Sequence, residues 1–118
     1  MKEIWKLFSG YLLILLLLLF SQGAFGQVKV IQFNAEWNAT NKVQWCTSKQ
    51  LTDCEVSYID IGTNTKAQNK YKVVVVPTII ILDDGEEVKR FQADISFKFS
   101  ATREEVQEAI DEIIMNKF

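Results

Sequence analysis

The stretch VKVIQFNAEWNATNK, residues 28–42, decides the fold that we expect. Its first part, VKVIQF, is rich in β-branched and aromatic residues and is typical of a buried central strand. Asn38 follows a short turn, and asparagine is among the residues that most often cap the N-terminus of a helix. We therefore expect a strand over residues 28–33 that runs through a tight turn into a helix over residues 39 to about 51.

The residues after this stretch alternate between strand patterns and helix patterns. Because a strand, a helix and a second strand follow one another, we expect the first two strands to be parallel. Pro77 would remove a ladder hydrogen bond inside a strand, so we place it at the start of one. The alternation of Ile95, Phe97 and Phe99 with polar residues predicts a strand extension that packs its aromatics on the core, with a solvent-facing partner site as the alternative. In chain order the expected elements are a strand over residues 54–61, a short helix over 63–71, a strand over 78–82, a hairpin return over 86–92, the extension over 93–101 and a last amphipathic helix with a capping box at Thr102 and Glu105.

The composition limits the classes of function. The chain has 118 residues, of which 48% are hydrophobic and 24% charged, and this is enough for one small domain. Its net charge is -2, whereas a nucleic-acid-binding surface needs a basic patch or stripe, so we expect no nucleic-acid partner. The chain has two cysteines and no histidine, which is too few ligands for a tetrahedral zinc site. We therefore expect neither a metal nor a cofactor.

The N-terminal residues form a separate unit. A lysine-containing start precedes a leucine-rich run over residues 11–20, and the small-x-small sequence AFG follows it. This order is typical of a secretory signal peptide, so we expect residues 1–26 to be a signal and residues 27–118 to be a secreted or periplasmic domain. An uncleaved membrane anchor is the alternative, because residues 4–25 approach the length of about 20 apolar residues that spans a bilayer.

Three segments together resemble the thioredoxin family. IQFNAEWNATNK, residues 31–42, resembles the family's strand and active-site turn, in which a hydrophobic strand leads through Ala-Glu-Trp into Cys-x-x-Cys-Lys. YKVVVVPT, residues 71–78, is similar to the family's segment around a cis-proline that faces the active site, and DGEEV, residues 84–88, resembles the hairpin turn that follows. The resemblance implies an α/β, thioredoxin-like three-layer fold in the order β-α-β-α-β-β-α, with a central mixed sheet flanked by helices.

The chain departs from the family at the residues that carry its chemistry. Asn38 and Asn41 stand where the family has cysteines, the first of which is a reactive thiolate. Asparagine can neither attack a disulfide nor resolve a mixed one. Gln32 replaces a strand aspartate that serves many members as a proton acceptor. We therefore interpret Trp37, Asn38, Asn41 and Lys42 as a degenerate active-site turn without a catalytic residue.

The resemblance also implies a binding surface. In the family the backbone beside the cis-proline pairs with an extended peptide, so Val76 and Pro77 would accept a peptide by strand addition. Trp37 and residues 93–99 would form neighbouring walls. Each of these residues also has a packing explanation, because apolar residues of a small domain are mostly core. The function expected from the sequence is that of a peptide- or protein-binding module without conventional thiol–disulfide exchange.

The remaining cysteines, Cys46 and Cys54, have three interpretations. A structural disulfide suits a compartment outside the cytoplasm and would contribute about 2 to 3 kcal/mol by closing a short loop. A displaced redox pair would instead make the protein a thiol–disulfide oxidoreductase. Against this, the helical spacing of Val43, Cys46 and Leu51 predicts that Cys46 faces the core, about two turns from the helix N-terminus whose dipole would lower a thiol pKa. Two free buried thiols are the third interpretation.

Overall fold

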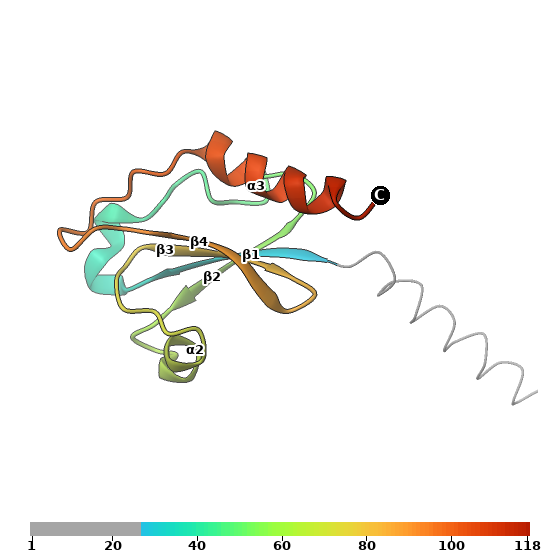
Figure 1. Cartoon of the computed structure of the whole chain (residues 1–118). Helices are drawn as coiled ribbons and strands as arrows, with labels where there is room; N and C mark the ends of the chain where they lie inside the picture. Colours follow the sequence, from blue (N-terminus) through green and yellow to red (C-terminus); the bar gives the residue numbers. More distant parts are fainter. Residues whose placement is uncertain (1–26) are drawn as a thin grey trace, which may run out of the picture.

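The computed structural model describes residues 27–118, and residues 1–26, which hold the expected signal segment, lie outside the described residues. Figure 1 shows the path of the chain through the described elements. In chain order they are β1 (Val28–Asn34), the 3-10 helix η1 (Glu36–Asn41), β2 (Glu55–Asp60), α2 (Thr65–Lys70), β3 (Thr78–Asp83), β4 (Glu86–Gln92) and α3 (Arg103–Met115). None of the described helices is long and apolar enough to cross a membrane.

The described strands form one four-stranded sheet in the order β2-β1-β3-β4. β1 pairs in parallel with β2 and antiparallel with β3, and β4 pairs antiparallel with β3. The register places Val30 of β1 between Val56 of β2 and Ile81 of β3. The parallel first pair and the hairpin at the end of the sheet confirm the mixed sheet predicted from the sequence.

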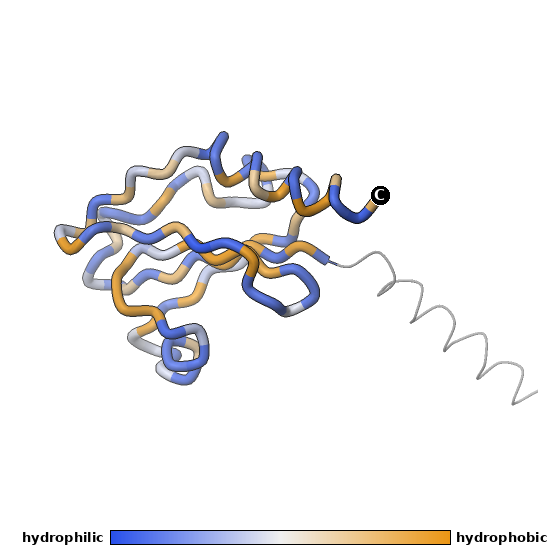
Figure 2. The backbone as a smooth tube through the Cα atoms, in the orientation of Figure 1, coloured by the Kyte–Doolittle hydropathy of each residue, from blue (hydrophilic) through white to orange (hydrophobic). Residues whose placement is uncertain are grey.

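Helices cover both faces of this sheet. Figure 1 shows α3 on one side and α2 on the other. Successive side chains of a strand point to opposite faces, so Ile79 and Ile81 join the hydrophobic cluster beneath α3, whereas Ile80 and Leu82 join the cluster beneath α2. Figure 2 shows the hydrophobic residues concentrated along the central strands, with hydrophilic residues on α2 and on the β3–β4 turn. This arrangement is the expected three-layer α/β fold.

The last helix forms where its amphipathic pattern predicts it. Val106, Ile110 and Ile113 are its buried residues, and they recur at the helical spacing of an inward-facing stripe. The backbone N–H of Glu105 donates a hydrogen bond of 3.2 Å to the Thr102 hydroxyl, which caps the helix. This bond is one of the two expected in the predicted capping box.

The helix predicted over residues 39–51 is wrong. The chain forms the short helix η1 and then single turns up to β2, and the N-cap of η1 is Ala35 rather than Asn38. In a helix the Val43 N–H would donate to the Ala39 carbonyl, but here it donates to the side-chain Oε1 of Gln32 on β1. The apolar side chains of Val43, Cys46 and Leu51 are nevertheless buried, as their spacing indicated. Burial of these residues therefore does not require an α-helix between them.

The strand predicted over residues 93–101 is also wrong. The Asp94 carboxylate accepts hydrogen bonds from the backbone N–H groups of Ser96 and Lys98 at 2.8 and 3.0 Å, and these bonds curl the chain into a tight loop. Short polar side chains such as aspartate commonly compete with sheet pairing in this way. Ile95 is 93% exposed and Phe97 is 37% exposed. Of the aromatic side chains in this segment, Phe99 packs against the core as predicted, and Phe97 does not.

We predict that Thr102→Ala lowers the free energy of unfolding by about 1 kcal/mol, because the first turn of α3 loses its side-chain cap. Urea denaturation followed by circular dichroism measures the change. Thr65→Ala is the matched control, since Asn64 and not Thr65 caps α2. Equal losses in both variants would contradict a capping role for Thr102.

Candidate functional site

The residues singled out by the sequence meet at one end of the two central strands. β1 ends at Asn34 and leads directly into η1, which carries Trp37. The neighbouring strand β3 starts beside this end, since Phe33 pairs with Thr78. The peptide bond between Val76 and Pro77, immediately before β3, is cis. The turn that carries Trp37 and the segment of Val76 and Pro77 therefore lie together where β1 ends and β3 begins. We call this part of the fold the corner.

The side chain of Asn38 occupies the centre of this corner. Asn38 is 3% exposed, and its backbone angles are non-helical inside η1, with φ −114° and ψ 22°. Its Nδ2 donates to Asn34 Oδ1 at 3.0 Å and to the Val76 carbonyl at 3.2 Å. Its Oδ1 accepts from Asn41 Nδ2 at 2.7 Å. The amide is satisfied on every side by these contacts, and it holds the turn, the end of β1 and the proline segment together.

Asn34 belongs to this network although the sequence reasoning did not single it out. Its own Nδ2 donates to the Asn38 backbone carbonyl at 3.2 Å, so Asn34 accepts from the side chain of Asn38 and donates to its backbone. Asn34 is 0% exposed. A polar residue at the last position of a hydrophobic strand, four residues before Asn38, was the available signal. Its partner could not be read from sequence spacing alone, because the turn geometry decides it.

Gln32 has a structural role at the position where a proton acceptor was expected in the family. Its Oε1 accepts from the Val43 backbone N–H at 2.8 Å, and its Nε2 donates to the Val43 carbonyl at 3.2 Å. Gln32 is 1% exposed, so both bonds form away from solvent. This pair of bonds fixes the irregular chain after η1 onto the sheet. The glutamine amide carries no ionisable group at this position.

The surface of the corner is aromatic. Trp37 is 68% exposed and packs edge-on against Phe97, with ring centroids 5.3 Å apart and an interplanar angle of 77°. Val76 and Pro77 are buried, so their side chains pack inside the fold. The Val76 carbonyl accepts from Asn38, while its N–H makes no hydrogen bond to any residue within the described range 27–118.

Lys42, the last residue of the predicted turn, lies beside a second strand. Its ammonium group is 4.6 Å from the centroid of the Tyr58 ring, within the range of a cation–π contact. Burial and the neighbouring Asp60 raise the pKa of the Tyr58 phenol, and a hydrogen bond with Asn34 opposes that rise. Lys42 therefore contacts β2 through the Tyr58 ring, next to the corner.

Both cysteines are free thiols in the structure, so the predicted bond between Cys46 and Cys54 is not formed in it. They pack in the same hydrophobic cluster beneath α3. Burial, followed by the nearby charge of Cys54, raises the pKa of Cys46 to about 12, although Lys42 opposes the rise. Burial and then Asp53 raise the pKa of Cys54 to about 11. The two thiols are close enough to influence each other, and the disulfide stays a prediction.

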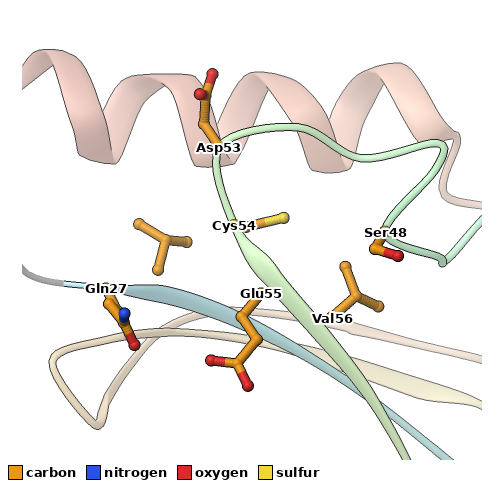
Figure 3. Close-up of a pocket in the computed structure, with 7 residues that line it drawn as sticks. Gln27, Ser48, Asp53, Cys54, Glu55 and Val56 are labelled. Atoms are coloured by element: carbon orange, nitrogen blue, oxygen red, sulfur yellow. The ribbon is translucent and has the colours of Figure 1, made fainter.

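A shallow pocket opens beside Cys54, at the end of the sheet away from Trp37. It has a volume of about 540 Å³. Figure 3 shows Cys54 among its lining side chains, together with the carboxylates of Asp53 and Glu55 and the hydroxyl of Ser48. A thiolate here would lie among negative charges, and such surroundings disfavour ionisation. The described residues contain no group of three or more side chains that could hold a metal ion.

We predict that Asn38→Ala lowers the free energy of unfolding by about 2 to 3 kcal/mol, because it leaves Asn34 Oδ1 and the Val76 carbonyl without their donor in the interior. Asn41→Ala is the comparison variant and should cost about 1 kcal/mol, since it leaves only one acceptor, Asn38 Oδ1, without its donor. Chemical denaturation measures both variants. A smaller loss for Asn38→Ala than for Asn41→Ala would contradict the central role of the Asn38 amide.

We predict slow alkylation of the reduced thiols at neutral pH, because the thiolate is the nucleophile and burial raises both pKa values. The iodoacetamide rate of Cys54 should increase until the pH reaches about 11, and that of Cys46 until about 12. Peptide mapping by mass spectrometry separates the two rates. A rate that levels off near pH 8 for either thiol would show a lowered pKa and contradict the prediction. The intact mass before reduction tests the disulfide in the same sample.

No family model matches the chain. Thioredoxins from Mycobacterium bovis and Mycobacterium tuberculosis are 30% identical to it over 66 residues, and the chain covers 57% of their length. Thioredoxin 1 from Thermosipho africanus has a TM-score of 0.56 at 24% identity, covering 75% of this chain and 97% of that one. Schistosoma mansoni thioredoxin has a TM-score of 0.58 at 20% identity, covering 83% of this chain and 87% of that one. The chain thus has the thioredoxin-like α/β fold.

Proposed function

We propose that this thioredoxin-like protein is a peptide- or protein-binding module of the cell envelope or secreted space that lacks conventional thiol–disulfide exchange. The observation that carries the proposal is the closed hydrogen-bond network of Asn38. An amide with three hydrogen-bond contacts lies where the exchange reaction needs a free thiolate. The location outside the cytoplasm rests on the sequence pattern of residues 1–26.

Several features support the absence of exchange chemistry. Asn38, Asn41 and Gln32 are neutral at every accessible pH, so the turn offers neither a nucleophile nor a proton acceptor. The alternative function, an oxidoreductase that uses Cys46 and Cys54, needs a thiolate at neutral pH. Burial raises the pKa of both thiols instead, to about 12 and about 11. These raised pKa values count against the alternative, because they lower the thiolate fraction at neutral pH.

Other features support binding. Trp37 exposes 68% of its surface beside the cis-proline segment, and exposed tryptophan is a frequent anchor in protein interfaces. The Val76 N–H has no hydrogen-bond partner among residues 27–118, and because Val76 is 2% exposed, a peptide must contact the corner closely to accept a bond from it. Strand addition uses such main-chain donors for affinity and neighbouring side chains for specificity. A peptide bonded to Val76 would pass Trp37 on its way across the corner.

We predict that the protein binds extended peptides but does not reduce disulfides. Insulin reduction by dithiothreitol should proceed at the same rate with and without the wild-type protein. The double variant Asn38→Cys/Asn41→Cys is the positive control, because even a thiol of ordinary pKa is a few per cent thiolate at pH 7. Turnover by the wild type that is lost in Cys46→Ser would establish the oxidoreductase alternative and refute the proposal.

Peptide binding is tested with a phage library of ten-residue peptides that contain no cysteine. The library is selected on the full chain, which is kept in an uncharged detergent. We expect selected peptides to bind Trp37→Ala about tenfold more weakly than wild type, the loss typical of a central aromatic anchor. Val88→Ala, which alters an exposed residue on β4, is the matched control and should leave the affinity unchanged. Failure to enrich any peptide, or equal losses in the two variants, would refute peptide binding at this corner.

A further inference from the structure

Another pocket lies next to the exposed rings of Trp37 and Phe97. It lies between the chain that follows η1 and the loop that follows β4, and has a volume of about 440 Å³. We call it the lysine groove, because Lys42 and Lys98 line it together with the aromatic rings of Trp45, Phe97 and Phe99. These rings come from segments that the sequence predicted to be a helix and a strand. The groove therefore exists because both segments are irregular.

The base of the lysine groove is aromatic and anchored in the core. Trp45 and Phe99 pack against each other with ring centroids 6.2 Å apart, and both also pack on the cluster beneath α3. Phe97 lines the groove and at the same time contacts Trp37 at 5.3 Å between ring centroids. The groove is thus continuous with the exposed tryptophan of the candidate site.

The loop that forms one wall is held in a single shape. Phe97 has a φ of +68°, a left-handed conformation that costs a non-glycine residue about 1 to 2 kcal/mol. The bonds from Ser96 and Lys98 to the Asp94 carboxylate hold it there, with a further bond of 3.0 Å from the Phe97 N–H to the Asp94 carbonyl. A wall that is ordered before binding lowers the entropy that a ligand must overcome.

The charge of the groove is opposite to that of the whole chain. The net charge of the chain is -2, yet no aspartate or glutamate lines the groove, whose charged residues are Lys42 and Lys98. Neither lysine takes part in an ion pair within 4.0 Å in the described part of the chain. The Asp94 carboxylate attracts Lys98 at longer range but is already bonded within its own loop. Two lysines beside aromatic side chains, with the Lys42 ammonium 4.6 Å from the centroid of the Tyr58 ring, suit a ligand that carries carboxylates beside an apolar group.

We propose that the lysine groove binds an acidic segment of an extended peptide, with carboxylates flanking an aromatic side chain. The inference rests on the proposed function and names the chemistry of the peptide that it binds. The aromatic side chain stacks on Trp45 and Phe99, and the flanking carboxylates pair with Lys42 and Lys98. Because Phe97 joins the groove to Trp37, one peptide can reach both the groove and the backbone of Val76.

The test uses three synthetic ten-residue peptides without cysteine, which differ only in a central Glu-Phe-Glu, Gln-Phe-Gln or Lys-Phe-Lys sequence. Their affinities for the full chain in an uncharged detergent are measured by calorimetry. We expect the acidic peptide to bind about tenfold more tightly than the neutral one and the cationic peptide to bind most weakly. Raising the salt from 0.1 M to 1 M shortens the screening length from about 10 Å to about 3 Å and should remove most of this preference.

Two double variants test whether the preference for the acidic peptide comes from the lysine groove. Lys42→Gln/Lys98→Gln should abolish the preference for the acidic peptide while leaving the affinity for the neutral peptide unchanged. Lys66→Gln/Lys70→Gln removes the same charge from α2, on the opposite face of the sheet, and should leave the preference intact. Equal affinity of the wild type for the acidic and neutral peptides would overturn the inference, as would an unchanged preference in the groove variant.

The outcomes separate this inference from the proposed function. If phage-selected peptides bind through Trp37 but show no preference for acidic residues, the lysine groove inference fails and the binding module stands. If no peptide binds at all, both fail. Vesicles of phosphatidylglycerol and phosphatidylcholine form a further arm. Vesicle binding that is lost in Lys42→Gln/Lys98→Gln, with no binding of the acidic peptide, would assign the lysines to an anionic membrane surface and overturn the inference.

Discussion

The side-chain amide of Asn38 joins three parts of the chain that must lie in fixed positions for the corner to exist. It bonds the end of β1 through Asn34, the last turn of η1 through Asn41, and the proline segment through Val76. Each buried partner that lost its bond would cost about 1 to 3 kcal/mol, so the network favours one arrangement over all others. The orientation of Trp37 follows from this arrangement, because η1 starts directly at the strand end that the amide fixes.

Much of the fold could be predicted from local patterns. The β-branched runs of β1 and β3, and the stripe of Val106, Ile110 and Ile113 in α3, have strong periodicities, and hydrophobic burial follows periodicity directly. The two failed elements carry conflicting signals. The chain after Asn38 has helical spacing of apolar residues, but the side chain of Gln32 bonds the backbone of Val43 within it. The chain after Asp94 has strand alternation next to a side chain that forms a turn. In both segments side-chain-to-backbone hydrogen bonding prevailed over the hydrophobic pattern.

The candidate site was only partly predictable. The sequence located Trp37 and Pro77, because their positions relative to the strands resemble those of the thioredoxin family. It did not reveal that Gln32 bonds the backbone of Val43 or that Asn38 reaches Val76, a contact between residues 38 apart in the chain. Such contacts depend on how the irregular segment after η1 folds back. The lysine groove was hidden for the same reason, since it lies between the two segments whose backbone the patterns misassigned.

Three physical requirements of thiol–disulfide exchange are altered together in this chain. Asn38 stands at the position where the resemblance to thioredoxins implies the nucleophile, and Gln32 at the position where it implies the buried proton acceptor. The third requirement is the helix N-terminus that lowers a thiol pKa, and here a 3-10 helix of six residues supplies only a short row of aligned peptide dipoles. Each replacement makes neutral hydrogen bonds that stabilise the corner. The aromatic surface and the Val76 N–H do not depend on an ionised thiol, so the proposed binding does not require exchange chemistry.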